Sequence, residues 1–355
     1  MNLKSYDELT RVGRIRRMRR IASKALKQFG VVDSKFWLMR QAGNTLFRVQ
    51  SSCFSDNDVP DDSFIKDHYL LRIHEPGYQE PEAIELELSW LAAMREIEKL
   101  PVPEPIRAMD GKHLIEITDP CVPGTRYCSL LKWVRGRSVK KNFKPYHLYE
   151  QGKLMAKLHN FSVLWQPSLG INKRRFDYNG LFTNDVGSGM PNKDAWAFLS
   201  PEHREAFSIV AEEIRDVMDA WGQNRENFGL IHGDLGVDAN LLFWHGKPRA
   251  IDFDDSGYGY YVFDLAVALE VCKDFPDYEI YRNELLRGYS EYRSLPNKEV
   301  EQLELFLAAL EVYWNLWATG GTHLYPEYLE EFKERMATTA DFVVRFVQKR
   351  KNNPQ

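Results

Sequence analysis

Apolar and polar residues follow two different spacings along this chain, and the change comes near residue 144. Before it, short apolar runs at residues 36–39, 46–49 and 68–74 are separated by polar and turn residues, which predicts strands. Residues 80–99 instead carry apolar side chains at three- and four-residue spacing, which predicts one long helix. The first part of the chain is therefore expected to be a sheet with one main helix.

Further elements follow from the same spacing. Two short strands are predicted at residues 106–108 and 113–117, and residues 11–29 form a leading helix with one apolar face and its arginines in water. Helical spacing predominates after residue 144. The helices predicted there are residues 147–161, 200–221, 263–271, 285–292, 300–317 and 328–349.

The region around residues 228–255 combines three apolar runs with polar residues between them. The runs at residues 228–231, 241–243 and 250–251 predict strands, and His232, Asp234, Asn240 and Asp252 stand between or after them. Phosphoryl transfer needs a carboxylate for the acceptor's proton and oxygen ligands for metal ions. Any one of these residues alone is more typical of a turn or a cap. Together, at this spacing, they favour a phosphoryl-transfer site.

These residues resemble the motif of the aminoglycoside phosphotransferase and choline kinase family, in which a His-x-Asp loop ends in Asn and Ile-Asp follows. The resemblance implies an α+β, two-lobed, protein-kinase-like fold: a small antiparallel-sheet N-terminal lobe with one main helix, and a larger, mostly helical C-terminal lobe. It further implies that Asp234 is the catalytic base and that Asn240 and Asp252 hold Mg²⁺. By the same resemblance, Asp264 supports the loop from the next helix.

One feature departs from the family pattern. The family places its Asn five residues after the catalytic Asp, where this chain has Ala239, and Asn240 comes sixth. Two arrangements remain open: the loop bulges and Asn240 binds the metal, or Asp238 replaces it, since both offer oxygen ligands suited to magnesium. The apolar run after Asn240 favours Asn240.

The first lobe carries the expected nucleotide clamp. Gly43 and Asn44 form a Gly-Asn pair between two strand-like runs, which predicts the turn of a β-hairpin. In kinases such a hairpin covers the nucleotide phosphates. Arg72 interrupts the next apolar run, either facing solvent or gripping phosphate oxygens. Glu87 in the following helix matches the family position that pairs with this cation, and Glu85 is the alternative.

The resemblance also divides the chain. Residues 1–129 would form the nucleotide-clamping lobe with its leading helix, residues 130–138 the linker between lobes, and residues 139–355 the lobe with the catalytic loop and the acceptor site. Lys132, Trp133 and Val134 stand in the expected linker, where main-chain groups of kinases bind adenine. That last assignment rests on order in the chain.

Composition narrows the classes of function. The chain has 355 residues with a net charge of −4 and 28% charged residues, which argues against nucleic acid as a partner. No apolar stretch is long enough to span a membrane, so no membrane partner is expected. The four cysteines match no zinc or Cys-x-x-Cys pattern, which favours a cytoplasmic location. A monomer or a homodimer fits equally well.

The predicted function is ATP-dependent phosphorylation of a hydroxyl on a small molecule, with Mg²⁺ and with GTP as an alternative donor. The short segment between Asp252 and Asp264 lacks room for a protein kinase's peptide platform, although a protein Ser/Thr kinase and a nucleotide-binding pseudoenzyme remain alternatives. Acidic and aromatic residues near the site suit an amino-bearing alcohol such as an aminoglycoside, homoserine or choline, unless the aromatic residues only fill the core. They are Asp254, Asp255, Glu270, Tyr258, Tyr260, Tyr261, Tyr313, Trp314 and Trp317.

Overall fold

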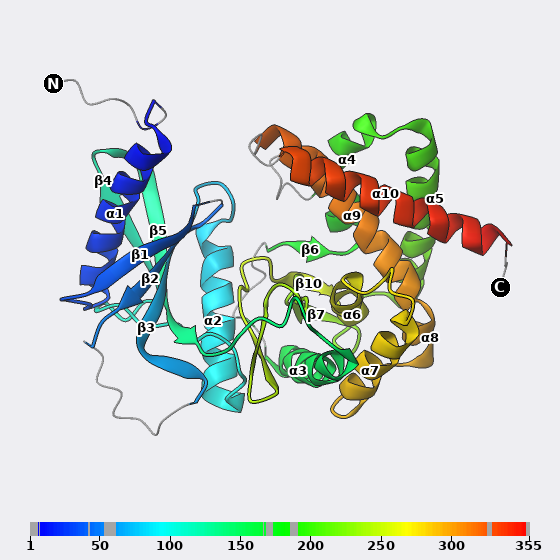
Figure 1. The fold of residues 1–355 in the computed structure, drawn as a ribbon, viewed down its shortest axis with the longest axis horizontal. Coiled ribbons are helices and arrows are strands. Elements are labelled where there is room, and N and C mark those ends of the chain that lie inside the picture. Colours follow the sequence, from blue (N-terminus) through cyan, green and yellow to red (C-terminus); the bar gives the residue numbers. More distant parts are fainter. Residues whose placement is uncertain are drawn as a thin grey trace.

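Two lobes lie side by side in the computed structural model, with the sheet-containing lobe on the left and the helical lobe on the right of Figure 1. The structure describes residues 6, 8–41, 43–52, 62–165, 167, 173–184, 191–324 and 329–352. Cys53, Asp56, Asp58 and Asp61 lie outside the described residues.

The smaller lobe is built on a five-stranded antiparallel sheet in the order β1-β2-β3-β5-β4. Its strands are β1 (Lys35–Gln41), β2 (Thr45–Gln50), β3 (Phe64–Ile73), β4 (Leu114–Asp119) and β5 (Val122–Val134). Helix α1 (Arg11–Gln28) packs its apolar face against this sheet in one hydrophobic cluster. The apolar residues of α2 (Pro81–Glu98) belong instead to the core of the larger lobe. Helix α2 therefore ties the two lobes together.

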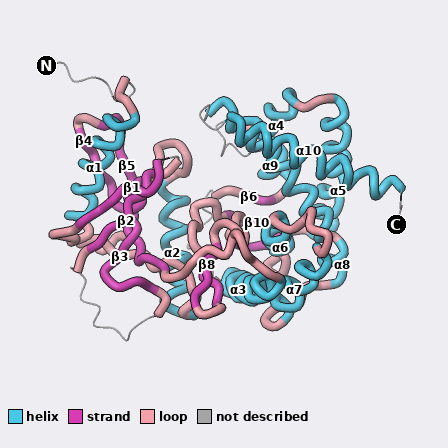
Figure 2. Tube along the Cα trace, in the orientation of Figure 1, coloured by secondary structure: helices cyan, strands magenta, loops and turns pink. Residues whose placement is uncertain are grey.

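The larger lobe consists mainly of helices, which Figure 2 shows in cyan. They are α3 (Pro145–Leu164), α4 (Asn192–Ala195), α5 (Pro201–Trp221), α6 (Tyr261–Glu270), α7 (Tyr278–Ser290), α8 (Asn297–Glu301), α9 (Leu303–Leu324) and α10 (Leu329–Asn352), with a π-helical turn (Gly180–Asn184) and a 3-10 turn (Trp196–Phe198). Its short strands are β6 (Arg175–Phe176), β7 (Phe228–Ile231), β8 (Leu241–Trp244), β9 (Lys247–Ala250) and β10 (Gly257–Tyr260). The β8–β9 hairpin and the β6-β10-β7 sheet hold the loops that carry the site.

Three expectations from the sequence need correction. Residues 106–108 are not a strand, because only isolated main-chain bonds, such as the Ile106 N–H to the Leu130 carbonyl at 2.8 Å, hold this segment to the sheet. Residues 130–134, expected in the interlobe linker, are the end of β5. The chain leaves the sheet after Val134, and Arg137 then pairs with Phe243 of β8. Helix α7 begins at Tyr278, seven residues before the predicted start at Leu285.

Among the described residues, no helix is both long enough and apolar enough to cross a bilayer.

Candidate active site

A cleft of about 840 Å³ brings the two lobes' polar residues together. The smaller lobe contributes its β1–β2 hairpin. The larger lobe contributes the loop between β7 and β8 and residues 252–255 after β9, which we call the acidic run. The cleft is lined by these residues that the sequence predicted for the site: Gly43, Asn44, Asp234, Asp238, Asn240, Asp252, Asp254, Asp255, Glu270, Trp314 and Trp317. Segments about 200 residues apart in sequence therefore share one cavity.

The loop between β7 and β8 is supported from below by Asp264 in the first turn of α6. The buried Asp264 carboxylate accepts the main-chain N–H groups of His232 at 3.2 Å and Gly233 at 2.8 Å. It also lies 3.1 Å from Nε2 of His159, a fully buried residue of α3. Burial is the largest single influence and raises the pKa of Asp264, but His159, His232 and the Gly233 N–H together outweigh it, and the net pKa is lowered. Asp264 is thus an ionised support for the loop.

His232 connects this loop to the acidic run. Its Nε2 lies 3.0 Å from the Ile251 carbonyl, and the Asp234 main-chain N–H points at Nδ1 at 3.3 Å. Because a carbonyl oxygen only accepts, Nε2 carries the proton and Nδ1 accepts, so the ring is neutral. Burial lowers the pKa of His232 and favours the same neutral form. The histidine is therefore a structural brace between the two segments.

Asp234 and Asn240 face each other at the end of the loop. The Asn240 amide donates to the Asp234 carboxylate at 2.8 Å and to the Asp234 carbonyl at 2.9 Å. The extra residue of the loop is absorbed in a turn closed by the Ala239 N–H to the Gly236 carbonyl, at 3.2 Å, and Ala239 is exposed. Asp238 also lines the cleft, and its carboxylate lies 4.0 Å from Lys140. The bulged loop therefore leaves Asn240 hydrogen-bonded to Asp234, whereas Asp238 lies beside Lys140.

Asp252 has an unusual backbone conformation, with φ at 64°. A non-glycine residue in this left-handed region is strained, and such strain is concentrated at functional sites. The charge of Asp254, ahead of desolvation in the cleft, raises the pKa of Asp252 well above its ordinary value. Burial raises the pKa of Asp254, but Arg72, the hydrogen bond with Asp252 and further cations together outweigh it, and the net pKa is lowered. These two carboxylates hence compete for one proton when no cation lies between them.

Arg72 of β3 and Glu87 of α2 form a buried ion pair behind the acidic run. Arg72 Nη2 lies 2.5 Å from Glu87 Oε1, and the residues are 2% and 1% exposed. Burial by itself would lower the pKa of Arg72, but Glu87 and Asp254 raise it, so the guanidinium stays charged. Glu85, the alternative partner, is exposed on the other side of α2. The pair places a positive charge close to Asp252 and Asp254.

The β1–β2 hairpin is tied directly to the acidic run. Asn44 donates to the Asp254 carboxylate at 2.8 Å and accepts the Glu75 main-chain N–H at 3.0 Å. Gly43 has φ at 63° at the hairpin tip, a conformation that glycine adopts without strain. The closed position of the hairpin therefore depends on a contact between the lobes.

Lys132, Trp133 and Val134 are not among the residues that line the cleft. Lys132 pairs with Glu104 at 2.7 Å, and the Trp133 ring lies 4.6 Å from the Arg48 guanidinium carbon. Their side chains thus hold the end of β5 in place.

Sequence reasoning missed several polar residues that the fold brings to the acidic run. Tyr78 donates to the Asp255 carboxylate at 2.8 Å, and Arg174 forms an ion pair with the same carboxylate. Gln79 donates to the Asp254 carbonyl at 2.6 Å. Tyr78 and Gln79 precede α2, whereas Arg174 precedes β6, so no local pattern links them to residues 252–255.

The far end of the cleft is formed by α6, α9 and α10. Trp314 and Trp317 line it together with Glu270, Lys273 and Arg335. The tyrosines that the sequence suggested for this role do not line it: Tyr260, Tyr261 and Tyr313 are buried in the core, and Tyr258 packs against it. The tyrosines therefore serve the core, whereas Trp317 lines the cleft and Trp314 both lines the cleft and packs against the core.

The described residues contain no group of three His, Cys, Asp or Glu side chains arranged to hold a metal ion. Magnesium is commonly held by one or two protein carboxylates together with nucleotide phosphates. Asp252 and Asn240 offer such a partial set of ligands. The amide nitrogen of Asn240 donates to Asp234, which leaves its side-chain oxygen for the metal.

Comparison with known proteins identifies the family. A family profile described as the phosphotransferase enzyme family matches residues 60–303. The chain belongs to this family. It is 22% identical over 250 residues to the amicoumacin kinase of Bacillus subtilis (strain 168), a match that covers 70% of this chain and 66% of that kinase, just under two thirds of its length. The family match defines the chain as a member of the phosphotransferase enzymes.

Solved structures agree with this class at the level of the fold. The microcompartment-associated aminopropanol kinase superposes with a TM-score of 0.75 at 22% identity, covering 93% of this chain and 98% of that one. The amicoumacin kinase hAmiN, solved with AMP-PNP, Ca²⁺ and Ami, gives a TM-score of 0.68 at 15% identity, covering 92% and 93%. The α+β, two-lobed, protein-kinase-like fold expected from the sequence is confirmed.

Proposed function

We propose that this protein transfers the γ-phosphoryl group of ATP to a hydroxyl of a small molecule that carries an amino group. The observation that carries the proposal is the pairing of Asp234 with Asn240 in a cleft that also holds Asp252. In this proposal Asp234 accepts the proton of the attacking hydroxyl, and its bond from Asn240 orients the carboxylate toward the acceptor.

Asn240 and Asp252 are the proposed ligands of Mg²⁺. The ion would supply charge neutralisation for the nucleotide's phosphates, which is the main electrostatic requirement of phosphoryl transfer. A cation at this position would also relieve the repulsion between Asp252 and Asp254, whose crowded carboxylates raise the pKa of Asp252. Because a bound cation would remove this repulsion between the two carboxylates, we expect the metal–nucleotide complex to bind tightly.

The smaller lobe would hold the nucleotide. Arg72, kept in place by Glu87, would contact its phosphates, and Gly43 and Asn44 would close over them. We assign the adenine contact to the main chain near Lys132, Trp133 and Val134, where β5 ends and the chain crosses to the larger lobe. Residues 1–129, 130–138 and 139–355 remain the proposed division into clamp, linker and catalytic lobe, with the first part of that linker still in β5.

The acceptor would bind between the acidic run and the two tryptophans. Glu270, Glu331 and Glu334 give this end of the cleft negative charge, while Trp314 and Trp317 offer aromatic faces. Carboxylates and indoles together favour a cationic nitrogen, either a protonated amine or a quaternary ammonium. An aminoglycoside, homoserine or choline would satisfy this chemistry.

The test is a screen of hydroxyl compounds for stimulated ATP consumption, with GTP as a second donor and with a denatured protein as a competing acceptor. We expect Mg²⁺-dependent ATP use with an amino-bearing alcohol, and a product heavier by one phosphoryl group in mass spectrometry. Transfer to the protein, or ATP hydrolysis that no acceptor stimulates, would contradict the proposal.

A further inference from the structure

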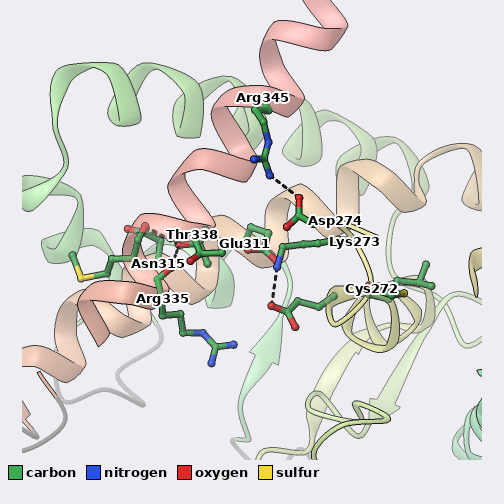
Figure 3. Close-up of polar contacts among 12 residues, drawn as sticks. Cys272, Lys273, Asp274, Glu311, Asn315, Arg335, Thr338 and Arg345 are labelled. Carbon is green, nitrogen blue, oxygen red and sulfur yellow. Dashed lines mark hydrogen bonds and ion pairs between the residues drawn. The ribbon is translucent and has the colours of Figure 1, made fainter. Parts of the chain in front are cut away.

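Arg335 of α10 lies at the acceptor end of the cleft and forms no ion pair with the described residues. Its guanidinium carbon lies 4.2 Å from the centre of the Trp314 ring, so the planar group rests on the indole face. None of its N–H groups donates to another described residue, and its Nε is buried without an acceptor among them. Figure 3 shows the guanidinium pointing away from the contact between α9 and α10, with no dashed line to any drawn residue.

Neighbouring cations differ from Arg335 because they have anionic partners. Lys273 lies 3.0 Å from Glu270 and 3.2 Å from Glu311, and Lys140 lies 4.0 Å from Asp238. Arg335 has no carboxylate within ion-pair distance among the described residues. An arginine remains protonated at any physiological pH, so a molecule that enters the cleft meets a charged donor at this position.

The position of Arg335 is fixed by the packing of α10 on α9. The buried Asn315 of α9 donates to the Met336 carbonyl at 2.7 Å and to the Thr339 hydroxyl at 2.9 Å. These bonds fix the turn of α10 that follows Arg335, and the stack on Trp314 fixes the far end of its side chain. A guanidinium held in this way loses little entropy when it binds an anion, because its orientation is already set.

Arg335 also faces the chemistry. Arg335 and Asp234 line the same cleft. A molecule with an anionic group bound to Arg335 would therefore lie in the cleft that also holds Asp234. The same end of the cleft offers Glu270, which uses Oε1 on Lys273. Opposite charges thus stand ready for opposite ends of one acceptor.

We infer that Arg335 binds a carboxylate of the phosphate acceptor, so that the acceptor is a hydroxylated amino acid and not a simple amino alcohol. This inference rests on the proposed function and narrows it to one substrate class. The guanidinium offers two parallel N–H donors, which match the two oxygens of a carboxylate. The amino group of the same molecule would face the carboxylates of the cleft.

The test compares acceptors that differ by one carboxylate: L-homoserine with 3-amino-1-propanol, L-threonine with 1-amino-2-propanol, and L-serine with ethanolamine. Choline and an aminoglycoside complete the panel. The variants are Arg335→Met, Arg335→Lys and the control Lys333→Met, which removes an exposed cation of the same helix from outside the cleft. The KM for ATP of each variant serves as the check that the nucleotide site is folded.

We expect the wild-type enzyme to prefer a carboxylate-bearing member of a pair. Arg335→Met should lower kcat/KM for that acceptor by about 10- to 100-fold, in line with loss of charged hydrogen bonds, and change the amino alcohol by less than about 3-fold. Arg335→Lys should fall between, since it retains the charge and loses the paired donors. Lys333→Met should match the wild type.

Three results would overturn the inference. Turnover of carboxylate-free acceptors alone is the first. An equal loss for both members of a pair is the second, since it would place the transferred phosphoryl group, and not the acceptor, on Arg335. Failure of every compound in the panel to stimulate ATP use is the third, and it would count against the proposed function as well.

Discussion

Replacing Glu87 with alanine would leave the Arg72 guanidinium buried without its main counter-charge. The two side chains are 3% and 1% exposed and their charged atoms are 2.5 Å apart. Removing one partner of a buried pair costs about 3–5 kcal/mol. Asp254 also raises the pKa of Arg72 and would compensate in part, so we expect a loss near 3 kcal/mol. Against a total stability of about 5–15 kcal/mol, that loss is large.

The double variant Arg72→Met/Glu87→Leu separates stability from function. Apolar residues of similar volume remove both buried charges, and such replacements are often neutral or stabilising. We expect its free energy of unfolding to lie within about 1 kcal/mol of the wild type, well above that of Glu87→Ala. Both variants should lose nucleotide-dependent activity. The double variant lacks the Arg72 guanidinium, and Glu87→Ala lacks the carboxylate that holds the guanidinium in place.

Urea unfolding followed by tryptophan fluorescence measures the free energies, and ATP titration of each variant measures nucleotide affinity. Arg72→Met alone is the matched control, since it leaves Glu87 buried without the arginine. The reasoning fails if Glu87→Ala unfolds within about 1 kcal/mol of the wild type, or if the double variant is as unstable as the single one.

Three further predictions follow from the loop, from a buried carboxylate and from helix packing. Asn240→Ala should raise the Mg²⁺ concentration needed for half-maximal activity by at least about 10-fold, whereas Asp238→Ala should change it far less; the reverse order would assign the metal to Asp238. Burial raises the pKa of Glu311 from 4.5 to about 7 against the opposing Lys273 charge. Between these two pH values the folded state keeps a proton that the unfolded chain has released, so stability falls as pH rises. At pH 8 the free energy of unfolding of Glu311→Gln, measured in urea, should therefore exceed that of the wild type by up to about 3 kcal/mol. At pH 4.5 the variant should show no such gain. Gly152→Ala should lower stability by at least about 2 kcal/mol, because the new Cβ would lie 2.2 Å from the Leu285 carbonyl oxygen across α3 and α7; a wild-type melting curve would contradict that packing.

Local patterns were sufficient for most elements and for the residues that lie close together in sequence. Apolar runs bounded by turn residues gave β7 and β8, and a helical stripe gave α2. The relation of Asp234 to Asn240 follows from the same short loop. The spacing alone could not place the extra loop residue, because it allows both an exposed turn at Ala239 and a metal-binding Asp238; only the apolar run after Asn240 favoured the first.

Contacts between distant segments were not predictable in the same way. Arg174, Tyr78 and Arg335 reach the cleft only because β6, the segment before α2, and α10 fold around it. Nothing in the neighbouring sequence distinguishes them from solvated surface residues. The end of β5 was misassigned for a related reason: its last residues alternate less clearly, and pairing with β3 and with Glu104 extends the strand to Val134.

The central claim is that Asp234 accepts the proton of a hydroxyl in a cleft that binds ATP independently. The most direct measurement pairs turnover with nucleotide affinity in Asp234→Asn, using the acceptor that most stimulates ATP consumption by the wild type. We predict that kcat falls by at least about 100-fold while the Kd for ATP with Mg²⁺ stays within about 3-fold. A variant that phosphorylates the acceptor at the wild-type rate would contradict the claim.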